Sequence, residues 1–287
     1  MNDLVAIART AFGLEVATPR PVDGSFSSSV LSFLATDERH YVVKQHWARH
    51  KAEREIAALR SYHADPYVPE LVDVADRDGV LTLLIEGRPG APWQAAAPMS
   101  DEFCVELGRA VAGLHLVEAN SFDGQPTWHE LLRHNADRYV AMIDESDVTV
   151  ATQARAVIVR HMDEIPASTQ PVIAHFDLRP GNILVLDGTL EAIIDFETAR
   201  GGHPSLDLFK LWREVPDVFV RMLGAYRSEW VEPAPWGEPD RLERLLWIYA
   251  AYNGLAGLAW CHSRDLAHDS FAVEGRTLIE QAASELV

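Results

Sequence analysis

The chain has 287 residues, 48% of them apolar, so it can bury a large core as one domain or as two. Its 43 acidic and 25 basic residues give a formal charge of −18, which repels nucleic acid and anionic lipid and attracts cations, although such acidity also serves solubility. The sequence has no apolar run of about 18 residues, no secretory signal and only two cysteines, too few for a disulfide framework or a zinc site. We therefore expect a monomeric cytoplasmic protein that binds neither nucleic acid nor a membrane.

The first third of the chain mixes helical and strand patterns. In order, we expect a helix over 3–12, strands over 29–35 and 39–45, a helix over 48–63, and strands over 71–74 and 79–85. The run 87–92 is rich in glycine and proline and interrupts this pattern. We place a boundary there, which divides the protein into lobes of residues 1–87 and 88–287.

Helical spacing dominates the second lobe. The expected helices cover 101–117, 128–143, 152–163, 206–213, 218–230 and 240–262, and Ser100 is the expected N-cap of the first. One β-hairpin interrupts them, formed by strands over 183–186 and 190–194 around a turn at Asp187-Gly188-Thr189. The expected fold class is α+β, with a small strand-rich N-terminal lobe and a larger, mainly helical C-terminal lobe.

Polar residues that could act in catalysis or metal binding concentrate between residues 172 and 197. Apolar runs there flank His175, Asp177, Asn182 and Asp195. Asp177 and Asn182 share one tight loop, and the hairpin that follows returns Asp195 to the side of Asn182. Phosphoryl transfer needs a carboxylate beside the attacking hydroxyl and hard oxygen ligands for a metal across the phosphates. Singly, each residue could cap a turn or pack in the core. Together they indicate that Asp177 accepts or orients the hydroxyl proton and that Asn182 and Asp195 hold Mg²⁺.

This segment resembles the catalytic and metal loops of the aminoglycoside phosphotransferase and choline kinase family, and its antibiotic phosphotransferase branch in particular. The resemblance implies the two-lobed protein-kinase-like fold and an ATP-dependent phosphotransferase with an alcohol group as acceptor. It assigns catalysis to Asp177, Mg²⁺ binding to Asn182 and Asp195, and a structural supporting role to His175.

Three further positions bear on the resemblance. The stretch 202–208 is similar to the family's Gly-Asp-Pro-x-x-Asp-Leu, which implies that Asp207 braces the catalytic loop, although His203 replaces the usual acid. Phe176 stands where the family often has glycine. Glu197 follows Asp-Phe where protein kinases have glycine, which favours the small-molecule branch.

The resemblance also implies an upstream lysine that reaches the phosphates of ATP. Lys44 lies in an apolar strand pattern and is one of only three lysines, although a solvent-facing strand lysine would look the same. Its implied helix partner is Glu55, which alone would read as a surface charge. Ser27 lies near the tip of an implied phosphate-covering hairpin, and the adenine edge is expected to pair with the Glu86 carbonyl and the Arg88 amide.

Three functions remain open. The first is O-phosphorylation of a cationic antibiotic, either an aminoglycoside or a basic cyclic peptide of the tuberactinomycin type such as capreomycin or viomycin, conferring resistance. The second is a metabolic kinase for choline, another amino alcohol or a sugar. The third is a nucleotide-binding protein without catalysis, which the presence of Lys44, Asp177, Asn182 and Asp195 together disfavours.

Overall fold

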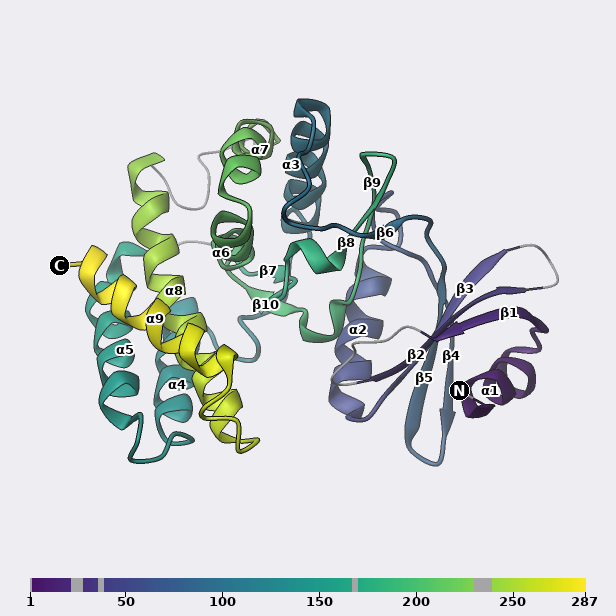
Figure 1. Cartoon of the computed structure of the whole chain (residues 1–287), viewed down its shortest axis with the longest axis horizontal. Coiled ribbons are helices and arrows are strands. Elements are labelled where there is room, and N and C mark those ends of the chain that lie inside the picture. Colours follow the sequence, from purple (N-terminus) through teal and green to yellow (C-terminus); the bar gives the residue numbers. More distant parts are fainter. Residues whose placement is uncertain (1, 22–27, 36–38, 167–169, 230–238) are drawn as a thin grey trace. The chain divides into compact units, whose positions relative to one another are not determined.

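The chain forms two compact units, each built from separate stretches of sequence. The structure is a computed structural model that describes residues 2–21, 28–35, 39–166, 170–229 and 239–287 (Figure 1). Unit 1 comprises Met1–Val117, His175–Arg200 and Glu214–Glu229, and unit 2 comprises Glu118–Ala174, Gly201–Arg213 and Trp230–Val287. All the described residues that line the candidate site belong to unit 1.

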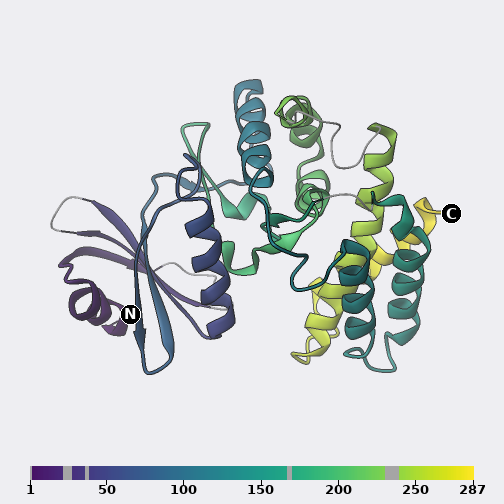
Figure 2. The same cartoon turned by 180° about the vertical axis from the view of Figure 1, so that it is seen from behind.

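A five-stranded antiparallel sheet forms the N-terminal part of unit 1. Its elements, in chain order, are α1 (Asn2–Phe12), β1 (Val16–Pro21), β2 (Ser28–Ala35), β3 (His40–His46), α2 (Arg49–Ser61), β4 (Leu71–Arg77) and β5 (Val80–Glu86). The strand order is β1-β2-β3-β5-β4, so β3 is central and Lys44 pairs with Leu83 of β5. Figure 2, which shows the unit from behind, places α2 alongside this sheet.

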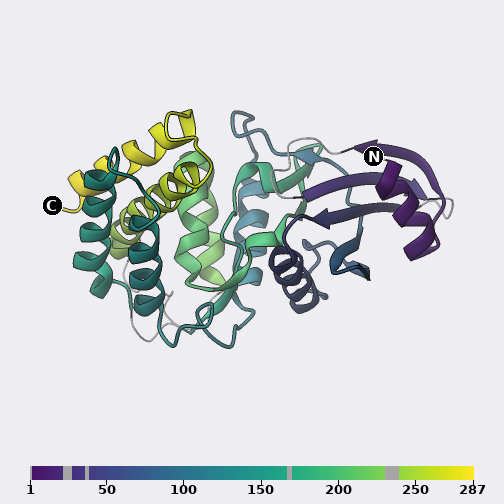
Figure 3. The same cartoon turned by 90° about the horizontal axis from the view of Figure 1, so that it is seen from below.

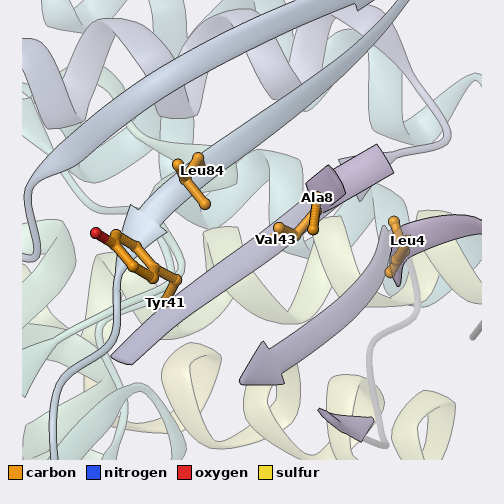
Figure 4. Packing of buried hydrophobic residues seen from close by; sticks show 5 residues of the cluster. All are labelled: Leu4, Ala8, Tyr41, Val43 and Leu84. Carbon is orange, nitrogen blue, oxygen red and sulfur yellow. The ribbon is translucent and has the colours of Figure 1, made fainter. Parts of the chain in front are cut away.

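The two faces of β3 serve different purposes, because successive side chains of a strand point to opposite faces. Tyr41 and Val43 face α1 and pack with Leu4, Ala8 and Leu84, and the burial of these apolar side chains anchors α1 to the sheet (Figure 4). Residues 44 and 46 share the other face, and both side chains contact Glu55 of α2. The alternation of β3 therefore separates an apolar face from a charged one.

The helices and strands predicted for the first third of the sequence are confirmed to within a few residues. Residues 36–38, between the two predicted strands over 29–35 and 39–45, lie outside the described residues. Strand β1 was not predicted, because its sequence Val-Ala-Thr-Pro-Arg-Pro contains two prolines. Proline lacks the N–H that a central strand donates and is tolerated at a sheet edge, which is where β1 lies.

Two helices and a second small sheet complete unit 1. The helices are α3 (Asp101–His115) and α7 (Pro216–Ser228), and the strands are β6 (Ala91–Pro92), β8 (Ile183–Leu186) and β9 (Thr189–Ile193) in the order β6-β8-β9. Ser100 caps α3 as predicted, accepting a hydrogen bond from the Phe103 amide at 3.1 Å. A Cβ at Gly108 would lie 2.4 Å from the Met222 carbonyl, so only glycine permits this close approach of α3 and α7.

Unit 2 is a helical bundle with a two-stranded sheet. Its helices are α4 (Trp128–Val140), α5 (Val148–His161), α6 (Pro204–Glu214), α8 (Pro239–His262) and α9 (Ser270–Glu285), and β7 (Val172–Ala174) pairs with β10 (Arg200–Gly202). Figure 3 shows α8 and α9 side by side, an approach that Gly254 and Gly275 permit. Buried hydrogen bonds join α4 to α8, from Trp128 to Tyr249 at 3.1 Å and from Asn135 to Tyr252 at 3.0 Å.

The predicted α+β fold class is confirmed, with strands concentrated in the first third and helices in the remainder. Helix α9 was not predicted. Cys104 and Cys261 are free and buried. Within the described part of the chain, no helix is both long and apolar enough to cross a bilayer.

Candidate active site

The loop that carries Asp177 is closed by a short 3-10 turn, Pro180–Asn182. Proline at the first position presets the turn, and Asn182, at its end, is buried. The Asn182 side-chain amide Nδ2 donates to the Asp177 carbonyl at 2.8 Å and to Asp177 Oδ2 at 3.1 Å. The turn therefore holds the two residues together through the backbone and side chain of Asp177.

His175 joins this loop to the segment that contains Asp195. Its Nδ1 accepts a hydrogen bond from the Asp177 amide at 3.2 Å, so the other ring nitrogen carries the proton. That nitrogen, Nε2, donates to the Ile194 carbonyl at 2.9 Å, and the ring packs against Phe196 with centroids 4.7 Å apart. His175 is buried and uses both nitrogens in fixing the backbone on either side of the site.

The β8–β9 hairpin returns the chain to the Asp177 loop. Its turn residues Asp187 and Gly188 have φ of 51° and 83°, the left-handed values that a tight hairpin turn requires. At the end of β9 the Ile194 amide donates to the Asn182 carbonyl at 2.9 Å. Asp195 follows in the left-handed region, with φ 69° and ψ 58°, a backbone strain that is common at functional sites.

A buried ammonium group lies at the centre of the site. Lys44 Nζ is 2.9 Å from Glu55 Oε2 and 2.5 Å from Asp195 Oδ1, and the Lys44 and Glu55 side chains are 8% and 2% exposed. Burial alone would lower the pKa of Lys44, but the charges of Glu55 and Asp195 outweigh it and raise that pKa above its ordinary value. Burial likewise raises the pKa of Glu55, and Lys44 outweighs it and lowers that pKa. Both groups are therefore ionised.

Three residues that the sequence analysis did not assign to the site extend this cluster. His46 Nε2 is 2.6 Å from Glu55 Oε2, and its Nδ1 is 3.4 Å from Glu197 Oε2. Lys51 Nζ is 2.8 Å from Glu197 Oε1. The position of His46 two residues after Lys44, and of Lys51 four residues before Glu55, indicates shared faces of β3 and α2. That spacing was the available signal.

Phe176 adopts φ 64°, a left-handed value that glycine reaches without strain and a bulky residue rarely adopts. The Arg200 guanidinium lies 3.7 Å from the centroid of the Phe176 ring, and Arg200 Nη1 donates to the Thr198 carbonyl at 3.0 Å. Thr198 in turn donates its hydroxyl to the His175 carbonyl at 2.8 Å. These contacts stabilise the strained residue next to Asp177.

The other residues predicted for the site are Ser27, Glu86, Arg88 and Asp207. Glu86 ends β5, and its carboxylate pairs with Arg88 Nε at 3.0 Å. Asp207 lies in α6 of unit 2 and is fully buried. Ser27 lies outside the described residues. No group of three or more His, Cys, Asp or Glu side chains arranged to hold a metal occurs in the part of the chain that the structure describes.

The fold and the arrangement of its charged residues define the class of protein as a phosphotransferase with the protein-kinase-like fold. A sequence model of the phosphotransferase enzyme family (APH) matches residues 18–243. The chain therefore belongs to this phosphotransferase enzyme family, and the predicted family and enzyme class are confirmed.

Similar solved structures extend over the whole chain. A thermostable mutant of aminoglycoside phosphotransferase APH(4)-Ia, in a ternary complex with AMP-PNP and hygromycin B, has a TM-score of 0.77 at 17% identity and covers 99% of this chain and 98% of that one. Macrolide 2′-phosphotransferase MphH from Brachybacterium faecium has a TM-score of 0.65 at 22% identity and covers 100% and 98%. At these identities the likeness shows the fold, and it confirms the predicted kinase-like class.

A curated relative matches over a shorter stretch. Homoserine kinase from Azorhizobium caulinodans is 33% identical over 139 residues, and the match covers 43% of this chain and 40% of the kinase. This chain thus matches less than half the length of that relative, so the similarity concerns only part of the homoserine kinase.

Proposed function

We propose that this protein transfers the γ-phosphoryl group of ATP to a hydroxyl group of a cationic antibiotic. The observation that carries the proposal is the Lys44 ammonium, which is buried and lies between Glu55 on α2 and Asp195 beside the Asp177 loop. A buried lysine held charged by carboxylates supports a phosphate-binding role, because its ammonium is positioned before the nucleotide arrives. The AMP-PNP complex of the APH(4)-Ia mutant supports ATP as donor.

In this proposal Asp177 is the catalytic residue that accepts or orients the proton of the attacking hydroxyl. The Asn182 amide donates to Asp177 Oδ2, so it fixes the rotation of the carboxylate, and His175 fixes its backbone amide. Phosphoryl transfer relies mainly on positioning and charge stabilisation, and such rigid support suits it. Asp207 is proposed to brace the same loop.

The donor set next to Asp177 fits a hard divalent cation. Because Asn182 Nδ2 is occupied by Asp177, its Oδ1 faces elsewhere, and it accepts no hydrogen bond from the described residues. Asn182 Oδ1 and the Asp195 carboxylate are both hard oxygen donors, and Mg²⁺ is commonly bound through one or two protein oxygens together with substrate phosphates. When bound, Mg²⁺ would neutralise phosphate charge. Lys44 would then contact phosphate oxygens.

Three positions complete the proposed nucleotide site. Ser27 is proposed to contact the phosphates, and the adenine edge is proposed to pair with the Glu86 carbonyl and the Arg88 amide. We also propose a lobe boundary at residue 87. We further propose that the protein is a monomer in the cytoplasm.

The cationic class of substrate follows from charge. A formal charge of −18 attracts polycations, and the APH(4)-Ia mutant was solved with the aminoglycoside hygromycin B. Aminoglycosides and basic cyclic peptides of the tuberactinomycin type, such as capreomycin and viomycin, both carry amines and hydroxyl groups. Phosphorylation of a hydroxyl on such a substrate would confer resistance.

A second candidate is a metabolic kinase that phosphorylates choline, another amino alcohol or a sugar. The match to homoserine kinase over 139 residues favours it, because homoserine also joins an amine to a primary hydroxyl. Such a substrate would require a much smaller acceptor site than an antibiotic.

One screen separates these candidates. Purified protein is incubated with Mg·ATP and, in turn, aminoglycosides including hygromycin B, capreomycin, viomycin, macrolides, choline, homoserine and sugars, and ADP release is measured. The Asp177→Ala protein is the blank for each acceptor. Turnover with a cationic antibiotic alone supports the proposal, turnover with homoserine or choline alone supports the second candidate, and ADP release that persists in Asp177→Ala contradicts the catalytic assignment.

A further inference from the structure

His46 lies between two carboxylates that come from different parts of unit 1. On one side Glu55 belongs to α2, and on the other Glu197 belongs to the turn Phe196–Thr198 directly after Asp195. The Nε2–Oε2 distance to Glu55 is 2.6 Å, that of a strong hydrogen bond. The Nδ1 atom has no hydrogen bond among the described residues and lies 3.4 Å from Glu197 Oε2, as an ion pair.

A protonated His46 ring adds positive charge where carboxylates outnumber ammonium groups. Three carboxylates (Glu55, Asp195 and Glu197) meet the two ammonium groups of Lys44 and Lys51. A neutral His46 would leave Glu55 and Glu197, whose side chains are 2% and 11% exposed, to share these two ammonium groups with Asp195. Burial and Lys44 oppose the charged ring, but Glu197 and Glu55 outweigh them, so the pKa of His46 is raised above its ordinary value.

The contacts of His46 link its charge to the positions of Lys44 and Asp195. Glu55 holds Lys44, and Glu197 is two residues from Asp195, so His46 contacts the partner of one phosphate-site residue and the neighbour of the other. Lys51 ties Glu197 to α2 independently at 2.8 Å. A displacement of either carboxylate would therefore move Lys44 or Asp195.

We propose that His46 is a positively charged positioning residue for the nucleotide site, holding Glu55 and the Glu197 turn together so that Lys44 and Asp195 face the phosphates. Lys51 acts as the second connection between α2 and this turn. The inference rests on the proposed phosphotransferase function and names residues outside its catalytic and metal-binding set. A neutral His46 would loosen both carboxylates and weaken nucleotide binding.

The first test measures Mg·ADP affinity by calorimetry for the wild type, His46→Gln, Glu197→Gln and the double variant. His40→Gln is the matched control, because His40 begins the same strand and is exposed. We expect His46→Gln to weaken Mg·ADP at least about tenfold at neutral pH and the control to change it less than about twofold. Because His46 acts partly through Glu197, the double variant should lose less than the product of the single losses.

The pH dependence separates a charged role from packing alone. Wild-type affinity should fall as pH rises through the raised His46 pKa, whereas the affinity of His46→Gln should lack this fall, since the ring that loses its charge has been removed. Equal affinity of His46→Gln and wild type overturns the inference. Parallel pH profiles overturn the charged role. A wild type that binds no Mg·ADP overturns the proposed function and the inference with it.

A measurement on the unmodified protein guards against a variant that fails to fold. The ¹⁵N signals of the histidine rings are followed in a pH titration, and the His46 signal is assigned by its absence in His46→Gln. We expect both His46 nitrogens to stay protonated above the ordinary histidine pKa of about 6.5. A His46 ring that loses its proton at or below that value contradicts the proposal, whatever the activity of the enzyme.

Discussion

Asn182 Nδ2 donates to the Asp177 carbonyl at 2.8 Å and to Asp177 Oδ2 at 3.1 Å, so one amide group fixes both ends of Asp177. With its nitrogen engaged in this way, Asn182 can offer only Oδ1 to a metal. The same side chain thus serves both the proposed proton acceptor and the proposed Mg²⁺ site.

Replacing Asn182 by alanine should therefore raise the Mg²⁺ concentration needed for half-maximal turnover and lower turnover at saturating Mg²⁺. The first effect reflects the lost oxygen ligand, and the second reflects the lost support of Asp177. Both are read from steady-state rates across a Mg²⁺ titration. Asn120→Ala, at an exposed bend, is the control and should match the wild type. An unchanged Mg²⁺ requirement in Asn182→Ala would remove this residue from the metal site.

The Lys44–Glu55 pair should show strong coupling in stability. Lys44→Met leaves the carboxylate of Glu55, 2% exposed, with His46 as its remaining partner among the described residues, which should still cost about 3 kcal/mol of unfolding free energy. The double variant Lys44→Met/Glu55→Gln should recover part of this loss, because it removes a buried carboxylate that has lost one of its two partners. Urea unfolding of the single and double variants measures the coupling.

An exposed pair on the same helix is the comparison for that measurement. Arg49 Nε and Glu53 Oε1 are 2.9 Å apart, with side chains 48% and 56% exposed, so Glu53→Gln should change stability far less than Lys44→Met does. Additive losses in the Lys44 and Glu55 variants would contradict a coupled pair.

In unit 2, Glu164 gives a stability that depends on pH. Hydrogen bonds from Arg244 at 2.7 and 2.9 Å, together with His161, lower the pKa of Glu164 to about 2 from 4.5. A lowered pKa stabilises the fold above the unfolded value of 4.5, and the stabilisation is lost as pH falls through about 2. Arg244→Gln should therefore lower the unfolding free energy by up to about 1 kcal/mol at neutral pH.

The deficit of Arg244→Gln should shrink as pH falls below 4.5 and vanish near 2, because the wild-type carboxylate is then protonated too. Urea midpoints measured across this range check the trend. Arg241→Gln, exposed on the same helix, should show no such pH dependence. A deficit that stays constant down to the lowest pH would mean that the guanidinium acts by packing rather than by charge.

Local patterns predicted much of unit 1. The β8–β9 hairpin followed from its Asp-Gly turn, and the return of the chain to the Asp177 loop followed from the hairpin, as the Ile194–Asn182 hydrogen bond shows. The strand that carries Lys44 was predicted, but the sequence left open whether its side chain faces solvent. Edge strand β1 was not predicted because its two prolines interrupt the strand pattern.

Contacts between residues far apart in the chain could not be predicted from local sequence patterns. Lys51 and Glu197 are 146 residues apart, and nothing near either residue in the sequence identifies the other. His46 lies just past the strand predicted over 39–45, and its contacts with Glu55 and Glu197 depend on the fold. The left-handed Phe176 was marked in the sequence only as a departure from the family's glycine, and the Arg200 ring contact that stabilises it depends on the fold.

The most direct test of the account is the turnover of Asp177→Asn, measured as phosphoryl transfer from ATP to the acceptor found in the screen, together with Mg·ADP affinity. Asparagine keeps an oxygen for the Asn182 amide but cannot take the proton. Asp187→Asn, at the left-handed hairpin turn that asparagine tolerates, is the matched control. We predict that Asp177→Asn loses at least about 10²-fold in turnover, while its Mg·ADP affinity changes less than about threefold and the control is unaffected. Wild-type turnover in Asp177→Asn would contradict the assignment of this site.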